Sequence, residues 1–494
     1  MNTQKWICLF LALLLSLPFA SCGAEDELPE TTETETAAAD VETAGETETE
    51  LHDGVPADLM FEDENINILY RGAFTDEFTA DGEGDIVNQA VYMRNLTVEE
   101  RLGITLTYIP NDNTDWNGGY QGVILQSVLA GDHSHDIVSG PSYHTPTLIL
   151  DNAILPLNDV AYLSLDMPWW SQGLIETTSI AGKLFFATGD ISLGMLKYIH
   201  CIFYNKDLCA NHGISDLSDV VFEGKWTLDK LNELASMGYV DLNGDGSAVL
   251  TDDQFGFIIT DQFLMRGLYD ALEMSYFNVG ESGSPEFDFG NPRTADAYDK
   301  LVTMLHSDDA IRMGNSTTNG NDDVYPVFTS DRALFVTGRF VDCETAYREM
   351  ESDFGLLPFP KWDEAQKEYK VTICGSESIF GLPINSRNPD MMGAVMEALA
   401  FESYKTVSPA YYESALKIKY SREEGDVSSR MVDIIKEGAV FNPVVQMSKF
   451  IGTDKILMHC IIDATPWTSA IAAQQKSLEA KLAEVISTVE QNYP

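Results

Sequence analysis

The sequence predicts an α/β protein with two lobes, chain crossings between them and a ligand cleft where they meet. The first observation is length, since 494 residues with 44% hydrophobic content exceed what one domain commonly holds. The second is an alternation of strand-like and helix-like stretches over residues 66–157, which is typical of a largely parallel sheet. The third is a change after residue 207, beyond which helical stretches dominate. The interface of two such lobes is a common place for a ligand.

The first lobe opens with a strand, a helix and a second strand. Ile66–Tyr70 alternates as a strand does, and apolar residues recur at near-helical spacing from Ile86 to Leu102, where Gly103 stops the pattern. The elements expected next are a strand over Ile104–Ile109, a helix over Gln121–Ala130, a short buried strand over Asp136–Val138, and a helix and turn over Leu148–Leu157. Because parallel strands carry ligand loops at their carboxyl ends, the loops Arg71–Phe74 and Ser139–Tyr143 should face one crevice.

The second lobe follows two strand-like stretches, Lys183–Ala187 and His200–Tyr204, with the loop Thr188–Gly194 between them. Strands are also expected at Ala333–Val336 and Phe354–Pro358. Helices are expected over Thr227–Met237, Thr294–Ser307, Pro389–Glu402, Ser428–Glu437 and Thr468–Asn492.

The first 22 residues have the pattern of a bacterial lipoprotein signal. Lys5 supplies a positive charge, and Trp6–Ala20 is an uncharged run of 15 residues, shorter than the roughly 20 that span a bilayer. Ser16–Cys22 ends in small residues and a cysteine, with Phe19 where leucine is usual. We expect the segment to be removed and Cys22 to be lipidated, with palmitate as an acyl chain, which would tie the protein to the outer face of the cell membrane. Ordinary secretion is the alternative.

Residues 23–64 are acidic and poor in apolar side chains. They hold 16 Asp and Glu residues and no Lys or Arg, with Thr and Glu alternating from Glu30 and again from Glu46. Low hydrophobicity and mutual repulsion predict a disordered tether that holds the folded part away from the lipid.

Charge and cysteine content exclude several classes of protein. A formal net charge of -48 repels nucleic acid and anionic lipid surfaces, so neither is expected as the main partner. Five cysteines remain after Cys8 and Cys22, and no two of the seven form a CxxC pair, which argues against a thiolate zinc site or a redox motif. At most two disulfides can form within the chain.

Residues 241–252 have the pattern of a calcium loop. Oxygen-bearing side chains stand at positions one, three, five and twelve, a glycine at position six and a backbone carbonyl donor at position seven: Asp241, Asn243, Asp245, Asp252, Gly246 and Ser247. Hard oxygen donors at alternate positions wrap the ion. Aspartate in place of glutamate at position twelve predicts weak binding. A structural Ca²⁺ that braces the second lobe is expected, and a metal-free polar turn is the alternative.

Several short segments follow one another in an order known from one family. They are Gly131-Asp132 before Asp136-Ile-Val, Leu155-Pro-Leu-Asn-Asp, Phe203-Tyr-Asn-Lys-Asp-Leu before Gly224-Lys-Trp-Thr-Leu, Phe328 to Gly338, and Gly355-Leu-Leu-Pro-Phe-Pro. This order resembles the extracellular solute-binding proteins of ABC importers, and among them the carbohydrate-binding group related to maltose-binding protein. The similarity runs from about residue 66 to about residue 490.

The resemblance implies a periplasmic-binding-protein-like clamshell, whose lobes close on a small-molecule solute and then dock on ABC permease subunits in the membrane. It places residues 65–190 with 354–405 in lobe 1, and residues 191–353 with 406–494 in lobe 2. Hinge crossings are expected near Asp190–Ile199, Asp353–Pro358 and Ser403–Ala410.

Sugars present hydroxyl rims and apolar faces, so their sites combine aromatic platforms with polar side chains. Loops after first-lobe strands offer Arg71, Ser139, Ser142 and Tyr143, and further candidates are Trp169, Trp170, the hinge residue Asp190 and Trp467. The resemblance adds Asp261, Phe263 and Arg266 as a ligand loop, and Arg339 and Phe340 where the family has a stacking aromatic. For the three tryptophans, packing in the core is the alternative, and for Asp190 the alternative is stabilisation of its turn.

No nucleophile-elbow, zincin or Walker motif occurs in the sequence, so no enzyme activity is expected. The prediction is a lipid-anchored binding protein that captures an extracellular solute, with an oligosaccharide as the expected ligand. A surface glycoside hydrolase and an adhesion lipoprotein are the alternatives.

Overall fold

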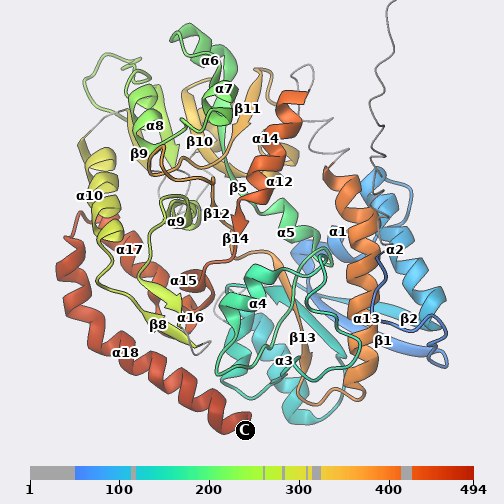
Figure 1. Ribbon diagram of the computed structural model, residues 1–494. Helices are drawn as coiled ribbons and strands as arrows, with labels where there is room; N and C mark the ends of the chain where they lie inside the picture. Colours follow the sequence, from blue (N-terminus) through green and yellow to red (C-terminus); the bar gives the residue numbers. More distant parts are fainter. Residues whose placement is uncertain are drawn as a thin grey trace, which may run out of the picture. The chain divides into compact units, whose positions relative to one another are not determined.

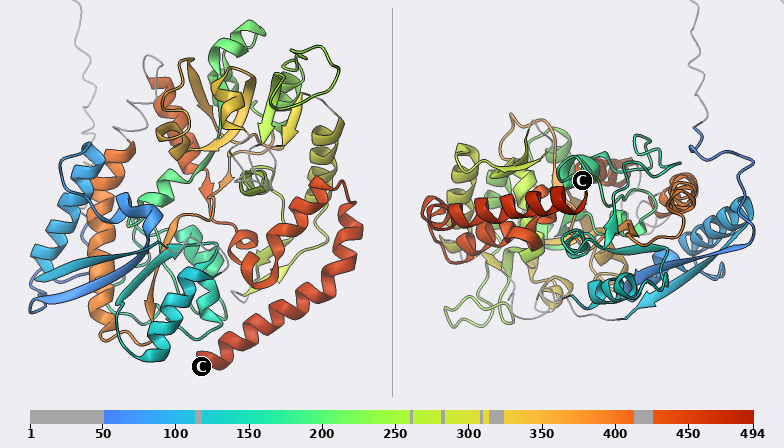
Figure 2. Two further views of the ribbon diagram at one scale, coloured as in Figure 1. Left: turned by 180° about the vertical axis from the view of Figure 1, so that it is seen from behind. Right: turned by 90° about the horizontal axis from the view of Figure 1, so that it is seen from below.

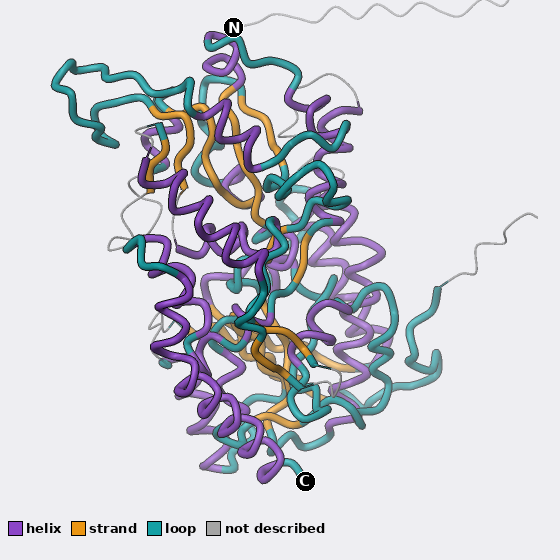
Figure 3. The backbone as a smooth tube through the Cα atoms, turned by 60° about the vertical axis from the view of Figure 1, so that its left-hand side comes forward, coloured by secondary structure: helices purple, strands orange, loops and turns teal. Residues whose placement is uncertain are grey.

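The strands of the protein form two separate five-stranded sheets. The structure, a computed structural model, describes residues 51–112, 118–259, 262–280, 284–307, 310–313, 324–412 and 426–494. Helices flank each sheet (Figures 1 and 3). There are also two small two-stranded pairings, of β12 (Val371–Thr372) with β14 (Ala439–Val440) and of β7 (Phe277–Val279) with β8 (Pro285–Phe287). The predicted α/β fold with two lobes is confirmed.

The first sheet has the strand order β2-β1-β3-β13-β4. Its strands are β1 (Glu64–Arg71), β2 (Ile104–Asn111), β3 (Ile137–Pro141), β4 (Ile154–Leu155) and β13 (Ser378–Pro383). β1 runs parallel to β2 and β3, while β13 is antiparallel to β3 and β4. The carboxyl ends of β1, β2 and β3 therefore lie at one edge, as the alternating pattern predicted.

Local sequence signals fix the helices of the first lobe. In α2 (Ile86–Leu102) the side chain of Asp85 accepts bonds from two backbone amides of the first turn, and Gly103 ends the helix with a φ of 62°. In α13 (Pro389–Glu402) Asn388 caps the start, and every side chain from Met391 on is buried. The other helices are η1 (Gly72–Phe74), α1 (Thr75–Phe78), α3 (Gly119–Ala130), η2 (Thr145–Ile149) and α4 (Gln172–Thr178).

The second sheet has the order β11-β5-β10-β6-β9. Its strands are β5 (His200–Asn205), β6 (Phe255–Ile259), β9 (Ile311–Met313), β10 (Ala333–Arg339) and β11 (Phe354–Leu357). β10 is central, parallel to β6 and antiparallel to β5, with Arg339 opposite His200. Around it lie α6 (Lys206–Asn211), α7 (Leu217–Phe222), α8 (Leu228–Ala235), α9 (Gln262–Ala271), α10 (Pro292–Ser307), α11 (Tyr325–Thr329), α12 (Phe340–Glu344) and α14 (Asp426–Glu437).

Within the described residues, the chain passes between the two lobes in three places. The first crossing contains α5 (Leu193–Lys197), and the third begins with the π-helix η3 (Ser403–Val407), which directly follows α13. The second differs from the prediction, because β11 pairs with β5 in the second sheet. The return to the first sheet runs through β12 (Val371–Thr372) to β13, so the lobe boundary expected at residue 354 falls too early.

The two ends of the described chain pack on the folded body. Residues 52–64, assigned to the tether by composition, join the first lobe: Val55 is buried, and Asp53 pairs with Arg101. The acidic composition of the whole segment gave no indication of these two contacts. At the other end, α18 (Trp467–Asn492) runs along the outside of the protein (Figure 2), and the Tyr493 hydroxyl donates to the Ile149 carbonyl at 3.1 Å.

The remaining C-terminal elements are β14 (Ala439–Val440), α15 (Pro443–Gln446), α16 (Ser448–Ile451) and α17 (Thr453–Ile462), while β7 (Phe277–Val279) and β8 (Pro285–Phe287) form a hairpin. Two predicted elements are absent from the described structure. Lys183–Ala187 makes isolated bridges instead of a strand, and Leu148–Leu157 holds only the end of η2 and the short β4. None of the described helices is both long and apolar enough to cross a bilayer.

Candidate functional site

The carboxyl ends of β1 and β10 meet at one aromatic pair. The guanidinium carbon of Arg71, the last residue of β1, lies 5.1 Å from the centroid of the Phe74 ring. The Phe74 and Tyr198 ring centroids are 5.6 Å apart, and the guanidinium carbon of Arg339, the last residue of β10, lies 5.6 Å from the Tyr198 ring. We call these four residues the junction cluster. It joins both sheets through Tyr198, which follows α5 in the first crossing.

Arg339 is held in place by Asp342 of α12, the helix that follows it, and by Tyr325 of α11. Its Nη2 lies 3.2 Å from Asp342 Oδ1 and 3.3 Å from the Tyr325 hydroxyl, while Asp342 Oδ2 accepts a bond from the Arg339 backbone amide. Burial by itself lowers the pKa of Arg339, but the Asp342 carboxylate and its neighbours raise it overall, so the guanidinium stays charged.

Arg71 and Tyr198 are half-buried, and their surroundings shift both pKa values. Burial lowers the pKa of Arg71, which the nearby Tyr198 partly opposes. Burial also raises the pKa of Tyr198 to about 12, so its phenol stays neutral at physiological pH. Phe74 is buried, so the half-buried ring of Tyr198 is the part of the cluster that can stack on the apolar face of a small polar molecule, while the two guanidinium groups can hydrogen-bond to its oxygens.

Sequence reasoning found both arginines of this cluster and missed both rings. Phe74 lies inside the loop expected to face the crevice, and Tyr198 lies inside the first predicted crossing. The available signal was therefore position: an aromatic residue in a loop or crossing that the sequence already placed at the junction.

The other predicted residues of the first sheet are buried beside the second crossing. Ser139 lies within β3 opposite Tyr70 and is fully buried. Ser142 donates to the carboxylate of the buried Glu377, and the backbone amide of Tyr143 donates to the Gly375 carbonyl at 3.0 Å. Ser142 and Tyr143 therefore anchor the returning chain, which is a structural role that their spacing could not reveal.

Trp169 and Trp170 were expected as a platform for a solute, and the structure corrects this. Both are buried in the first lobe, where their indole N–H groups donate to Glu397 at 3.1 and 2.8 Å. A buried indole needs an acceptor, and Glu397 on α13 supplies it to both. The alternative of core packing is the one the structure shows.

Trp467 and Phe340 are likewise corrected. Trp467 is buried at the start of α18, with its ring centroid 5.1 Å from that of Tyr276 and 6.3 Å from that of Tyr298. Phe340 is fully buried at the start of α12. Large apolar rings at these helix starts fill the core of the second lobe.

Asp190 lies in the first crossing, as expected, but it contacts the third. It is half-buried, and it accepts a hydrogen bond from Ser408 just beyond η3. Burial raises the pKa of Asp190 to about 6, while Ser408 and the charge of Lys436 act in the opposite direction. The residue connects two crossings.

Some candidates fall outside what the structure describes. Phe263 and Arg266 belong to α9, which directly follows β6, but the placement of their side chains is not described. Asp261 and the lipidation residue Cys22 lie outside the described residues.

In the predicted calcium loop, side-chain oxygens accept bonds from the loop's own backbone. Asp241 accepts from the amides of Gly244 and Gly246 at 2.6 and 2.9 Å, and Asp245 accepts from Ser247 at 2.7 Å. Asp252 is exposed, whereas its buried neighbour Asp253 closes the loop by accepting from Leu242 and Val249. Over the residues with described placement, no three His, Cys, Asp or Glu side chains gather as metal ligands. Calcium stays a prediction.

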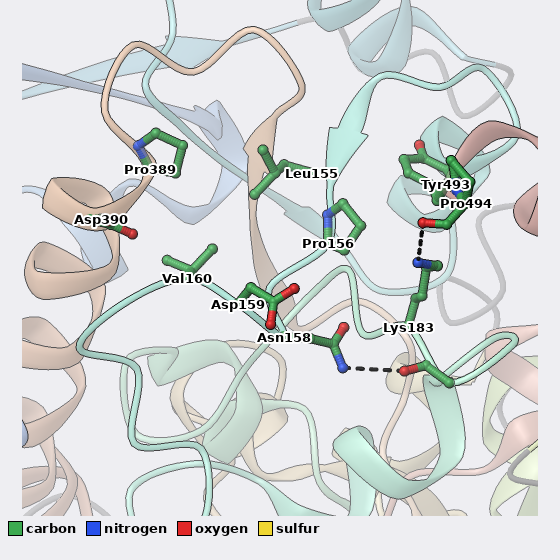
Figure 4. A pocket seen from close by; sticks show the side chains of 11 residues that line it. Leu155, Pro156, Asn158, Asp159, Val160, Lys183, Pro389, Asp390, Tyr493 and Pro494 are labelled. Carbon is green, nitrogen blue, oxygen red and sulfur yellow. Dashed lines mark hydrogen bonds between the residues drawn. The ribbon is translucent and has the colours of Figure 1, made fainter.

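A hollow of about 680 Å³ lies on the first lobe beside Tyr493 (Figure 4). Its lining comes from the end of β4 and the loop after it, the turn at residues 182–183, the start of α13, and Tyr493 with Pro494. None of the predicted site residues and none of the junction cluster lines it, so we do not place the solute there.

Comparison with solved structures identifies the fold. A cyclo/maltodextrin-binding protein complexed with maltotetraose has a TM-score of 0.54 at 12% identity, covering 87% of this chain and 97% of its own. An ABC transporter solute-binding protein from Thermotoga lettingae bound with α-D-tagatose has a TM-score of 0.52 at 13% identity, covering 85% and 100%. The chain has the fold of the two-lobed solute-binding proteins.

A third similar structure is that of UspC from M. tuberculosis, with a TM-score of 0.53, 13% identity, and coverage of 84% of this chain and 100% of its own. No protein-family model and no curated protein sequence matches the chain. The resemblance inferred from short segments is confirmed as a shared fold. The similar structures whose names state a role are binding proteins rather than enzymes.

Proposed function

We propose that this protein captures a carbohydrate outside the cytoplasmic membrane and delivers it to an ABC importer by closing its lobes, without chemical change. The junction cluster carries the proposal. Arg71 comes from one sheet and Arg339 from the other, and both lie against rings that flank the first crossing. A sugar placed there would touch both lobes at once, which is what closure requires.

Two observations support the choice of solute. Two proteins of the same fold have structures in complex with maltotetraose, an oligosaccharide, and with α-D-tagatose, a monosaccharide. In addition, Asp342 already compensates the charge of Arg339, so the cluster is suited to hydroxyl groups as well as to anions. Within the carbohydrates, we propose an oligosaccharide.

The N-terminal pattern supports the remaining parts of the proposal. Lipidation at Cys22 and the acidic segment behind it would hold the binding protein near its permease at a high effective concentration while leaving it free to dock. We further propose that the loop containing Asp241 and Asp245 binds a structural Ca²⁺, on the basis of its donor spacing.

The test is equilibrium binding to a panel of labelled glycans, followed by recovery of the ligand. Saturable binding with the glycan unchanged is expected. A shortened glycan would identify a glycoside hydrolase, and the absence of any thermal shift or binding across the panel would favour an adhesion protein.

A matched pair of variants locates the site. Arg71→Ala removes a junction arginine and should weaken binding about tenfold or more. Arg348→Ala removes an arginine that is 60% exposed at the second-lobe surface and should leave the affinity unchanged. Equal affinities for both variants would place the site elsewhere.

A further inference from the structure

Lys197 connects the two lobes through two ion pairs. It is the last residue of α5, in the first crossing. Its Nζ lies 2.5 Å from Asp76 Oδ2, which belongs to α1 of the first lobe, and 3.3 Å from Glu344 Oε2, which belongs to α12 of the second lobe. One ammonium group is thus shared by a carboxylate from each lobe.

The same first-lobe helix also holds the other end of α5. Glu77, the neighbour of Asp76 on α1, accepts a bond from the Gly194 amide at 3.0 Å. Two consecutive carboxylates of the first lobe therefore hold both ends of the crossing helix, while Glu344 reaches it from the second lobe. Tyr198 follows Lys197 directly, so the position of α5 sets the position of the ring between Phe74 and Arg339.

The two ion pairs differ in their exposure to water. The side chains of Lys197 and Glu344 are 13% and 24% exposed, whereas that of Asp76 is 62% exposed. Burial alone would lower the pKa of Lys197, but Asp76 and Glu344 raise it overall, so the lysine stays charged. If the lobes separate, the pair with Asp76 is the one that water and salt replace more readily.

We propose that Lys197 is an ionic clasp that holds the two lobes together and so regulates access to the junction cluster. The proposal rests on the proposed function in one respect, namely that opening admits the solute. The clasp itself can be tested without any solute.

Cys374 offers a reporter that needs no solute. It is buried at 3% exposure, and its backbone amide donates to the Tyr198 carbonyl at 3.3 Å, so opening of the junction should expose it. The experiment measures the rate of maleimide labelling at Cys374 by peptide mass spectrometry on the purified protein, with Cys209, buried in the second lobe, as an internal reference.

Asp76→Asn should raise the labelling rate at Cys374 about two- to fivefold, the effect expected for a partly exposed ion pair. About 0.5 M NaCl should do the same to the wild-type protein and add little in the variant, because salt screens the same pair. Asp229→Asn is the matched control, since it removes a 73% exposed carboxylate 2.6 Å from Lys300 within the second lobe. It should leave the rate unchanged.

Asp76→Glu keeps the carboxylate and should label Cys374 as slowly as the wild type does. Glu344→Gln removes the second-lobe partner of Lys197 and should also raise the labelling rate at Cys374. If Asp76→Asn and Glu344→Gln both melt like the wild type and label at its rate, the clasp is excluded. Faster labelling at Cys209 as well would indicate loosened packing and would also contradict the proposal. The labelling experiment uses no solute. If no glycan of the panel binds, the labelling results are therefore unaffected, and the two proposals can fail separately.

Discussion

Two regions of the protein bring aromatic rings against charged side chains, and they do so for different purposes. In the first lobe, Trp169 and Trp170 are buried and share the carboxylate of Glu397, and we call these three residues the tryptophan core. At the junction, Phe74 and Tyr198 lie between two arginines from different sheets. The tryptophan core is closed and satisfied within one lobe, whereas the junction cluster is shared by both.

The difference shows that the type of side chain does not decide its role. The tryptophan ring is larger than that of tyrosine and offers more apolar area to a sugar. Here, however, the indole N–H groups donate to Glu397 inside the core. Tyr198 is less conspicuous in sequence, but the crossing brings it to the place where the lobes meet. Stability should therefore depend on the first region and solute affinity on the second, and the following experiments test that division.

The largest effect is expected in the tryptophan core. Glu397→Ala leaves two buried indole N–H groups and the Ser164 amide without their acceptor, and should lower the free energy of unfolding by about 4 kcal/mol. Urea unfolding measures it. In this background Trp170→Phe should be less harmful than in the wild type, because it removes one orphaned donor. Additive losses would show that Glu397 does not act through the indoles.

The next effect concerns a buried carboxyl beside the crossing. Burial raises the pKa of Glu77 from 4.5 to about 7. The folded protein binds this proton more tightly than the unfolded chain does. The stability that protonated Glu77 contributes is therefore fully present below the pKa of the unfolded state, and it is lost as the pH rises through the pKa of the folded state.

The free energy of unfolding of Glu77→Gln should therefore match that of the wild type near pH ~4.5 and exceed it by up to about 3 kcal/mol near pH ~8. Urea unfolding at both pH values provides the measurement. A variant with the same pH dependence as the wild type would contradict the raised pKa.

A smaller effect is expected on affinity at the junction. Tyr198→Ala removes the ring between Phe74 and Arg339 and should weaken solute binding about tenfold, or about 1.4 kcal/mol. The melting temperature should change little, because the ring is half-buried. Tyr198→Phe keeps the ring and should bind nearly as the wild type does. Isothermal titration calorimetry distinguishes the variants, and unchanged binding by Tyr198→Ala would remove the tyrosine from the site.

The smallest effect is expected at the predicted calcium loop. With aspartate at position twelve the site should be weak, so about 2 mM CaCl₂ should stabilise the protein by about 1 kcal/mol. Asp241→Asn should abolish the gain in thermal melting, and Asp229→Asn should preserve it. If CaCl₂ does not change the melting temperature of the wild-type protein, the loop is a metal-free turn.

Much of the fold could be predicted because its signals are local. The predicted helix from Ile86 to Leu102 coincides with α2, and Pro389–Glu402 coincides with α13, since capping residues and apolar spacing mark both. Lys183–Ala187 has the composition of a strand and forms isolated bridges instead, because a strand also needs a neighbour with free backbone groups. The lobe boundary at residue 354 was wrong for the same reason, since β11 pairs in the second sheet.

The candidate site was harder to predict. Arg71 could be located because it ends a parallel strand, and strand ends gather at one edge. Ser142 has the same position after β3, but Glu377, which lies 235 residues away in sequence, binds it. No spacing in the chain indicates such a partner.

The sequence by itself determined the fold class, most helices and strands, and the position of Arg71 directly after the first strand. These features follow from periodicity and capping within a few residues. Only the tertiary structure decided which aromatic residues lie at the junction, that Asp253 closes the loop at 241–252, and that Lys197 is shared by both lobes. The physical reason is that burial and electrostatic contacts depend on distances in space, which the crossings set between segments far apart in the chain.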